Sequence, residues 1–124
     1  SAYSRFRAGD ETMLSLLAAA EVVLIPATVL GELEAAFELG GRTRENRTAL
    51  SNFLEEPFVT VLPTTPEVAR RYGQAFARLR EAGTPIPTND VWIAAATIDA
   101  GGRLVTFDAH FNQVPGLDCL VLGD

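Results

Sequence analysis

Hydrophobic and polar positions follow two different patterns along this chain. Short runs of mainly apolar residues cover positions 22–27, 58–63 and 103–107, and a less regular run covers 117–123. Runs of this length, rich in Val, Leu and Ile and bounded by Pro or Gly, are typical of strands that are buried on both faces. We therefore predict three buried strands and a fourth strand at the C-terminal edge of the sheet.

Between these runs, apolar residues recur at every third or fourth position, which is the spacing of amphipathic helices. We predict helices over residues 11–20, 29–39, 42–56, 66–82 and 90–100.

The ends of these helices carry capping signals. Thr28 and Thr65 each precede a helix, and Pro66 occupies the first helical position after Thr65, where proline is favoured. Thr88 and Asn89 precede the last helix, and both are residue types that cap helices well.

Strands that are apolar throughout and alternate with helices indicate a parallel sheet with helices on both faces. We predict an α/β protein with a three-layer α/β/α architecture, in which residues 1–124 form a single domain. The chain opens with a loop and a helix at the place where this alternation requires a strand. We therefore expect that a first strand is missing from the chain as given.

Composition excludes several kinds of site. The longest apolar stretch, residues 22–31, is interrupted by Pro26 and is about half as long as the ~20 residues that a membrane span needs. One cysteine, Cys119, and one histidine, His110, allow neither an internal disulfide nor a Cys/His zinc site. These features fit a protein of the reducing cytoplasm with no membrane partner.

Charge limits the possible partners and mechanisms further. The formal net charge is −6, which is the wrong sign for holding nucleic acid on a broad basic face. All ten basic residues are arginine, so every mechanism that needs a lysine amine is excluded. Arg42, Arg44 and Arg47 form one basic helix face, which we interpret as a solvated surface, with contact to nucleic acid or a protein as the alternative.

Three acidic residues follow the predicted strands. Glu32 lies in the first turns of the helix after residues 22–27, Asp90 opens the last helix, and Asp108 follows residues 103–107 directly. Each has an ordinary explanation when it is taken alone: a solvated helix position, a helix cap and a turn residue. Together they would meet at the edge of a parallel sheet where ligands bind, and unpaired carboxylates so close would repel one another.

A bound cation is the best explanation for such a cluster. Oxygen ligands alone select a hard ion, Mg²⁺ or Mn²⁺, over zinc. Two such ions can activate a water and stabilise the leaving oxygen in phosphodiester hydrolysis, which requires no histidine, cysteine or lysine.

Other reactive or aromatic residues have less specific explanations. His110 could act as a general base, although a structural or exposed role is the more common one for a lone histidine beside Phe111. We expect Cys119 to be a packing residue, and Trp92 and Phe111 to belong to the core and not to a platform for stacking bases.

At this point the sequence resembles a PIN-domain ribonuclease of the VapC toxin type, from type II toxin–antitoxin systems, over nearly its whole length. The stretch "IPATVLGELEAAFELG" matches the strand and helix that carry a glutamate in this family, which places that role on Glu32. "TNDVWIAAATIDAGGRLVTFDAHFNQVPGL" matches the family's most specific stretch and places its acids on Asp90 and Asp108. Thr106 and Asn89 fit accessory polar positions.

The resemblance implies a PIN-like fold and an Mg²⁺- or Mn²⁺-dependent endoribonuclease, with Glu32, Asp90 and Asp108 as catalytic residues and metal ligands. It also implies a homodimer that a cognate antitoxin protein inhibits. The start of the chain departs from the family pattern, because family members begin with a strand that ends in an aspartate. Ser1 would then be an accessory residue that follows this aspartate, and the aspartate itself would lie upstream of the chain as given.

Two other classes of protein compete with this interpretation. A receiver-type signalling domain also has a parallel sheet with an acidic, Mg²⁺-binding edge, but it needs a lysine, and the same requirement argues against a phosphatase of the haloacid-dehalogenase type. A PIN-like interaction module without activity is the other alternative, because the first expected aspartate is not in the chain.

Overall fold

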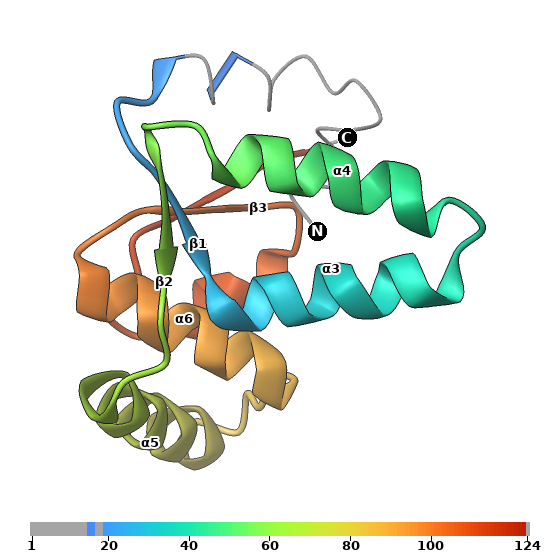
Figure 1. Ribbon diagram of the computed structural model, residues 1–124. Helices are drawn as coiled ribbons and strands as arrows, with labels where there is room; N and C mark the ends of the chain where they lie inside the picture. Colours follow the sequence, from blue (N-terminus) through green and yellow to red (C-terminus); the bar gives the residue numbers. More distant parts are fainter. Residues whose placement is uncertain (1–14, 17–18, 124) are drawn as a thin grey trace.

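The computed structural model describes residues 15–16 and 19–123 (Figure 1). Ser1 and most of the helix predicted at residues 11–20 lie outside this part of the chain, although Ser15, Leu16 and Ala19 are helical. Strands and helices alternate along the described chain as the hydrophobic pattern predicted. In order, they are β1 (Val23–Pro26), α3 (Ala27–Leu39), α4 (Thr43–Leu54), β2 (Val59–Leu62), α5 (Pro66–Glu81), α6 (Thr88–Ala100), β3 (Leu104–Thr106), the 3-10 helix η1 (Ala109–Gln113) and β4 (Cys119–Val121).

The strands form two parallel pairs. Val23 of β1 lies opposite Val59 of β2, and Leu104 of β3 lies opposite Cys119 of β4. The predicted strands and their parallel direction are therefore confirmed. In the part of the chain that the structure describes, however, the pairs are separate two-stranded sheets. They stay separate because no described strand lies between β1 and β3 to hydrogen-bond to both.

Helices pack on both sides of these strands. α3 and α4 share one core, in which Leu33, Phe37 and Leu50 are buried. α5, α6 and η1 share another, which includes Leu79 and Phe111. Figure 1 shows α4 on one side of the strands and the α5–α6 pair on the opposite side. This arrangement agrees with the predicted α/β/α layers.

The helix ends agree with the predicted capping only in part. The Thr65 hydroxyl accepts a hydrogen bond from the Val68 N–H, with Pro66 at the first helical position, as expected. The prediction for Thr28 is wrong, because α3 continues directly from β1 and begins one residue earlier, at Ala27. The backbone turns from strand to helix at Pro26, so Thr28 is already helical and no side chain caps α3.

α6 is largely apolar and contains more buried residues than α3, α4 or α5. Ala94 and Ala95 have no exposed surface, and Val91 is almost fully buried. The helix packs extensively against α5 and also contacts α3 and β1. Small alanine side chains allow this close approach on several sides, and the buried part of α6 runs from Val91 to Thr97. No helix among the described residues is long and apolar enough to cross a membrane.

Candidate active site

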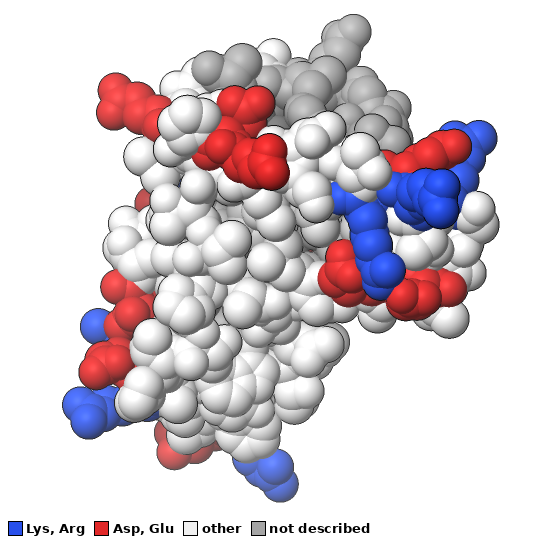
Figure 2. Space-filling model, in the orientation of Figure 1, with Lys and Arg blue, Asp and Glu red and all other residues white. Residues whose placement is uncertain are grey.

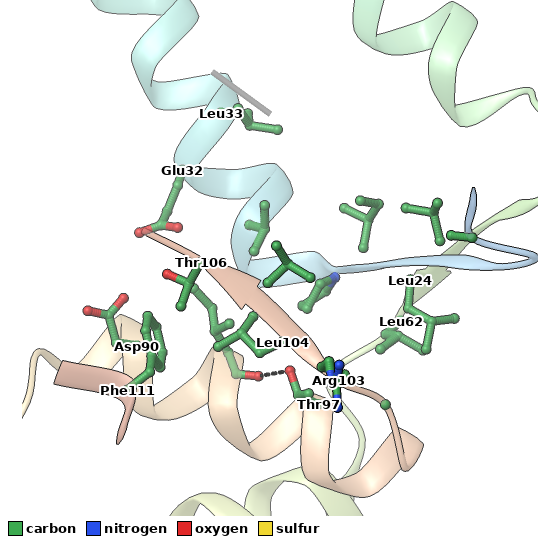
Figure 3. Close-up of a pocket in the computed structure, with 18 of the residues that line it drawn as sticks. Leu24, Glu32, Leu33, Leu62, Asp90, Thr97, Arg103, Leu104, Thr106 and Phe111 are labelled. Atoms are coloured by element: carbon green, nitrogen blue, oxygen red, sulfur yellow. Dashed lines mark hydrogen bonds between the residues drawn. The ribbon is translucent and has the colours of Figure 1, made fainter. Parts of the chain in front are cut away.

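A cavity of about 610 Å³ is bounded by β1 and β3 and by residues of α3 and α6. Most of its lining is apolar, with side chains such as Leu24 and Leu104. Figure 3 shows Glu32, Asp90 and Thr106 toward one end of this cavity and Arg103 toward the other. Asp108, which follows β3, also lines it. The three predicted acids therefore come from separate segments and border a single cavity.

Glu32 lies in the second turn of α3, beside the buried Leu33. Burial raises the pKa of the Glu32 carboxyl above its usual range, and the negative charges of Asp90 and Asp108 raise this pKa further. The repulsion expected among these carboxylates is therefore present, and a cation bound near them would relieve it.

Asp90 is in the first turn of α6, with only 16% of its side chain exposed. Thr88 and Asn89 were expected to precede the helix and cap it, but this prediction is wrong. The helix begins at Thr88, its N-cap position is Pro87, and no side chain caps it. Proline at the N-cap has no hydroxyl or carboxylate, and the side chain of Asp90 does not cap the helix either.

The carboxylate of Asp90 is instead held by His110. The distance between His110 Nε2 and Asp90 Oδ2 is 2.8 Å, so the imidazole N–H donates to the carboxylate. The His110 ring also lies against the Phe111 ring, with 4.9 Å between the centroids. These contacts give His110 a defined role in orienting Asp90, which the sequence did not reveal. His110 reaches Asp90 because η1, the 3-10 helix that follows Asp108, places the histidine next to the first turn of α6.

Asp108 occupies the N-cap position of η1, but its side chain does not cap that helix. Its backbone N–H donates to the Thr106 hydroxyl at 3.1 Å. Thr106 is buried and lines the cavity, so it fixes the backbone at the point where β3 ends. An accessory position for Thr106 is consistent with this contact.

Asn89 and Ser1 were also predicted as accessory residues of the site. Asn89 is exposed and is not among the residues that line the cavity, although it is adjacent to Asp90. Ser1 lies outside the described residues.

The donor set suits a hard cation but does not by itself form a complete site. Carboxylate oxygens are the ligands that Mg²⁺ and Mn²⁺ prefer. Within residues 15–16 and 19–123, no three His, Cys, Asp or Glu side chains are grouped so that they could hold a metal ion as placed. The acids could therefore bind a cation only with additional donors or with a change in side-chain position.

The arginine-rich face of α4 is partly neutralised. Arg47 forms ion pairs with Glu34 and Glu38 of α3, and all three side chains are substantially exposed. Figure 2 shows arginine and acidic side chains interleaved at this end of the molecule. The pairing supports the interpretation of Arg47 as part of a solvated surface.

The packing predictions are largely met. Phe111 is buried in the core, and Trp92 stacks on Tyr72 with 4.0 Å between the ring centroids. Cys119 is partly buried, and its thiol donates to the Asn112 side chain at 3.2 Å.

Comparison with known proteins agrees with this geometry. The PIN domain family matches residues 2–117. Ribonuclease VapC2 of Rickettsia felis is 28% identical over 105 residues, which are 84% of this chain and 77% of that protein.

Two solved VapBC structures contain chains that are similar to this one in fold. A crystal structure of VapBC2 from Rickettsia felis bound to a DNA fragment from their promoter contains a similar chain, with a TM-score of 0.77, 27% identity, and coverage of 87% of this chain and 80% of that one. A chain in DNA-bound VapBC from Salmonella typhimurium has a TM-score of 0.73 and 26% identity, with coverage of 79% and 74%. The match along nearly the whole sequence, together with the parallel α/β architecture, shows that this chain belongs to the PIN-domain family and is of the VapC type.

Proposed function

We propose that the chain is a metal-dependent endoribonuclease, which hydrolyses RNA phosphodiester bonds with Mg²⁺ or Mn²⁺ at Glu32, Asp90 and Asp108. The observation that carries this proposal is that these acids, from three separate segments, border one cavity and act on one another electrostatically. Similarity to ribonuclease VapC2 supports the choice of RNA as the substrate.

The side chains have distinct roles in this proposal. Glu32, Asp90 and Asp108 would hold the cation, which would supply charge neutralisation at the phosphate and an activated water. His110 holds the Asp90 carboxylate in place, and Thr106 positions the backbone of Asp108. The raised pKa of Glu32 means that this carboxyl releases its proton less readily than an exposed glutamate. Metal binding should therefore strengthen as the pH rises, because protons and the cation compete for Glu32.

Cleavage of RNA by purified protein tests the proposal directly. We expect cleavage with Mg²⁺ or Mn²⁺ and none with EDTA. Asp90→Asn removes a charge that borders the cavity and should reduce cleavage by about 100-fold or more. Asp99→Asn is the matched control on the same helix, because Asp99 pairs with Arg71 away from the cavity and should leave the rate unchanged. Equal activity of both variants and wild type would show that the site is misassigned.

We further propose that a cognate antitoxin protein binds this chain and blocks the cavity, that the chain forms a homodimer and that it acts in the cytoplasm. The similar chains in VapBC structures support the first of these proposals. Co-expression with a candidate antitoxin, chosen as a small protein encoded beside this chain, followed by co-purification and an RNase assay of the complex, tests it.

A second candidate function is an interaction module without activity. It is favoured by the lack of a complete metal-binding group among the described residues. An antitoxin complex that forms normally, together with no cleavage by the free protein at any metal concentration, would favour this candidate over the nuclease.

A further inference from the structure

Three aromatic rings stack on one another across α5 and α6, and the outermost ring is exposed. The Trp92 ring lies 4.0 Å from the Tyr72 ring, and the Tyr72 ring lies 5.9 Å from the Phe76 ring, measured between centroids. The interplanar angles are 21° and 26°, so the rings are nearly parallel. Trp92 and Tyr72 are partly buried, whereas Phe76 is 38% exposed. The stack therefore ends in a ring that solvent can reach.

Arg80 extends this stack along α5. Residues four apart on a helix are neighbours, so Tyr72, Phe76 and Arg80 form a line on its surface. We call these three residues and Trp92 the stacking row. Arg80 is exposed, and in the described part of the chain its side chain forms no ion pair, unlike that of Arg71 on the same helix. The stacking row thus places an apolar ring beside a positive charge that no acid neutralises.

The surface of α5 beside the Phe76 ring is uncharged. The other exposed positions next to Phe76 on the helix are Gly73 and Ala77. Their small side chains leave room for a flat group against the ring, and no acidic side chain of α5 adjoins it. This part of the helix can therefore accept a planar, negatively charged ligand.

We infer that the stacking row binds one nucleotide of a single-stranded RNA, with the base on Phe76 and the phosphate at Arg80. The inference rests on the proposed ribonuclease function and adds a contact outside the cavity. Proteins commonly bind single-stranded RNA by stacking bases on aromatic side chains beside a positive charge that contacts the backbone. Every base has a π-face, so the stacking row holds RNA without selecting its sequence.

The stacking row lies at the same end of α6 as the candidate active site. Trp92 comes two residues after Asp90 in that helix. Leu79, which precedes Arg80, packs in one core with Val91, the residue after Asp90. Figure 1 shows α5 and α6 side by side, and the two helices pack against each other. None of the four residues of the row lines the cavity, so the nucleotide bound there lies beyond the scissile phosphate.

The charge of Arg80 favours RNA over an apolar partner. RNA supplies a phosphate next to every base, which matches one exposed ring beside one positive charge. A purely apolar surface that covered Phe76 would also remove Arg80 from water without giving it a counter-charge, which is costly. The protein has a net charge of −6, so it has few other places that attract a polyanion.

Binding of a short, fluorescein-labelled oligoadenylate tests the stacking contact. Fluorescence anisotropy in EDTA measures affinity under conditions in which no cleavage is expected. Phe76→Ala should weaken binding about tenfold or more, since stacking on an aromatic ring commonly contributes that much. Phe76→Tyr keeps the ring and should bind as wild type does. Phe76→Leu keeps an apolar side chain without a π-face and should bind as weakly as Phe76→Ala.

Arg80→Gln tests the phosphate contact. It should lower the affinity and reduce the slope of log affinity against log salt concentration by about 0.7, the value for one phosphate of a single strand. Arg70→Gln is the matched control, because Arg70 is exposed on the same helix about 15 Å away along its axis, and it should leave the slope unchanged.

Phe58→Ala is the matched control for the ring. Phe58 is 37% exposed but lies just before β2 and outside the stacking row, so its loss should not change RNA affinity. Circular dichroism confirms that each variant is folded.

Several results would overturn the inference. These are the absence of saturable RNA binding, equal affinity of wild type, Phe76→Ala and Arg80→Gln, and full affinity in Phe76→Leu. A dimer that dissociates in Phe76→Ala with no change in RNA affinity, as measured by sedimentation, would show instead that a second copy of the chain covers the row.

The same measurements separate this inference from the proposed nuclease activity. Wild type that binds RNA through Phe76 and Arg80 but cleaves none with Mg²⁺ or Mn²⁺ would contradict the nuclease and support the stacking row. Wild type that cleaves RNA while the Phe76 and Arg80 variants bind it unchanged would support the nuclease and overturn the stacking row.

Discussion

At the scale of single residues, Glu32 and Asp90 border the same cavity but have different surroundings. Asp90 accepts a hydrogen bond from His110, whereas Glu32 is partly buried beside the charges of Asp90 and Asp108. Burial and like charge both act against the ionised form of Glu32. The site therefore contains one carboxylate held by a donor and one that is destabilised when it is charged.

Glu32→Gln should stabilise the metal-free protein near neutral pH. A carboxyl with a pKa raised on folding contributes its full stability below the unfolded pKa, about 4.3 for glutamate, and this contribution is lost as the pH rises through the folded pKa. Wild type should therefore unfold at a lower temperature than the variant in EDTA near neutral pH, and this difference should vanish below about pH 4. Thermal unfolding at several pH values measures it.

Glu21→Gln, at an exposed position, is the control and should show no such pH-dependent difference. Added Mg²⁺ should raise the unfolding temperature of wild type more than that of Glu32→Gln. A variant that is no more stable than wild type at neutral pH would contradict the assigned environment of Glu32.

His110→Ala should lower Mg²⁺ affinity and RNA cleavage by about 10- to 100-fold, because partners that orient metal ligands commonly contribute that much. His110→Gln keeps an N–H donor and should restore part of the loss. Calorimetric titration of Mg²⁺ measures the affinity without relying on activity. Full Mg²⁺ affinity in His110→Ala would show that the contact with Asp90 is incidental.

At the scale of elements, the start of each helix shows how local signals succeed or fail. Thr65 is itself in an extended conformation at the N-cap position, so its hydroxyl can reach the Val68 N–H. Thr88 and Asn89 have suitable side chains, but Pro87 provides the extended residue and shifts the helix start by two residues from the predicted Asp90. A side chain therefore caps a helix only if its own residue takes the non-helical N-cap position.

Thr65→Ala should reduce the free energy of unfolding by about 1 kcal/mol, because the Val68 N–H loses its partner. Thr88→Ala should change it by less than about 0.5 kcal/mol, since Thr88 is exposed and caps nothing. Urea denaturation of the two variants and of wild type measures both changes in the free energy of unfolding. Equal losses in the two variants would contradict the assigned caps.

At the scale of the whole molecule, stability comes from cores on the two sides of the strands. Leu79 of α5 is among the largest fully buried side chains described, whereas Leu39 at the end of α3 is 90% exposed. The hydrophobic pattern predicted that both helices have a core-facing side, but how deeply a given residue is buried depends on the helices that pack over it.

Leu79→Ala should cost about 2–5 kcal/mol of unfolding free energy, as is usual when a large buried side chain is truncated. Leu39→Ala should stay within about 0.5 kcal/mol of wild type. Chemical denaturation distinguishes the two. A large loss in Leu39→Ala under dilute conditions would mean that this exposed residue is covered in solution.

The sequence by itself determined the order of strands and helices, the parallel α/β class and the three acids Glu32, Asp90 and Asp108 as a candidate set. Those features follow from local hydrophobic periodicity and from the rule that the carboxyl ends of parallel strands share an edge. Tertiary structure alone decided that His110 holds Asp90, that the pKa of Glu32 is raised, and that the strands among the described residues form two separate pairs. These features depend on how segments far apart in the chain approach one another, and residue type and spacing do not determine those distances.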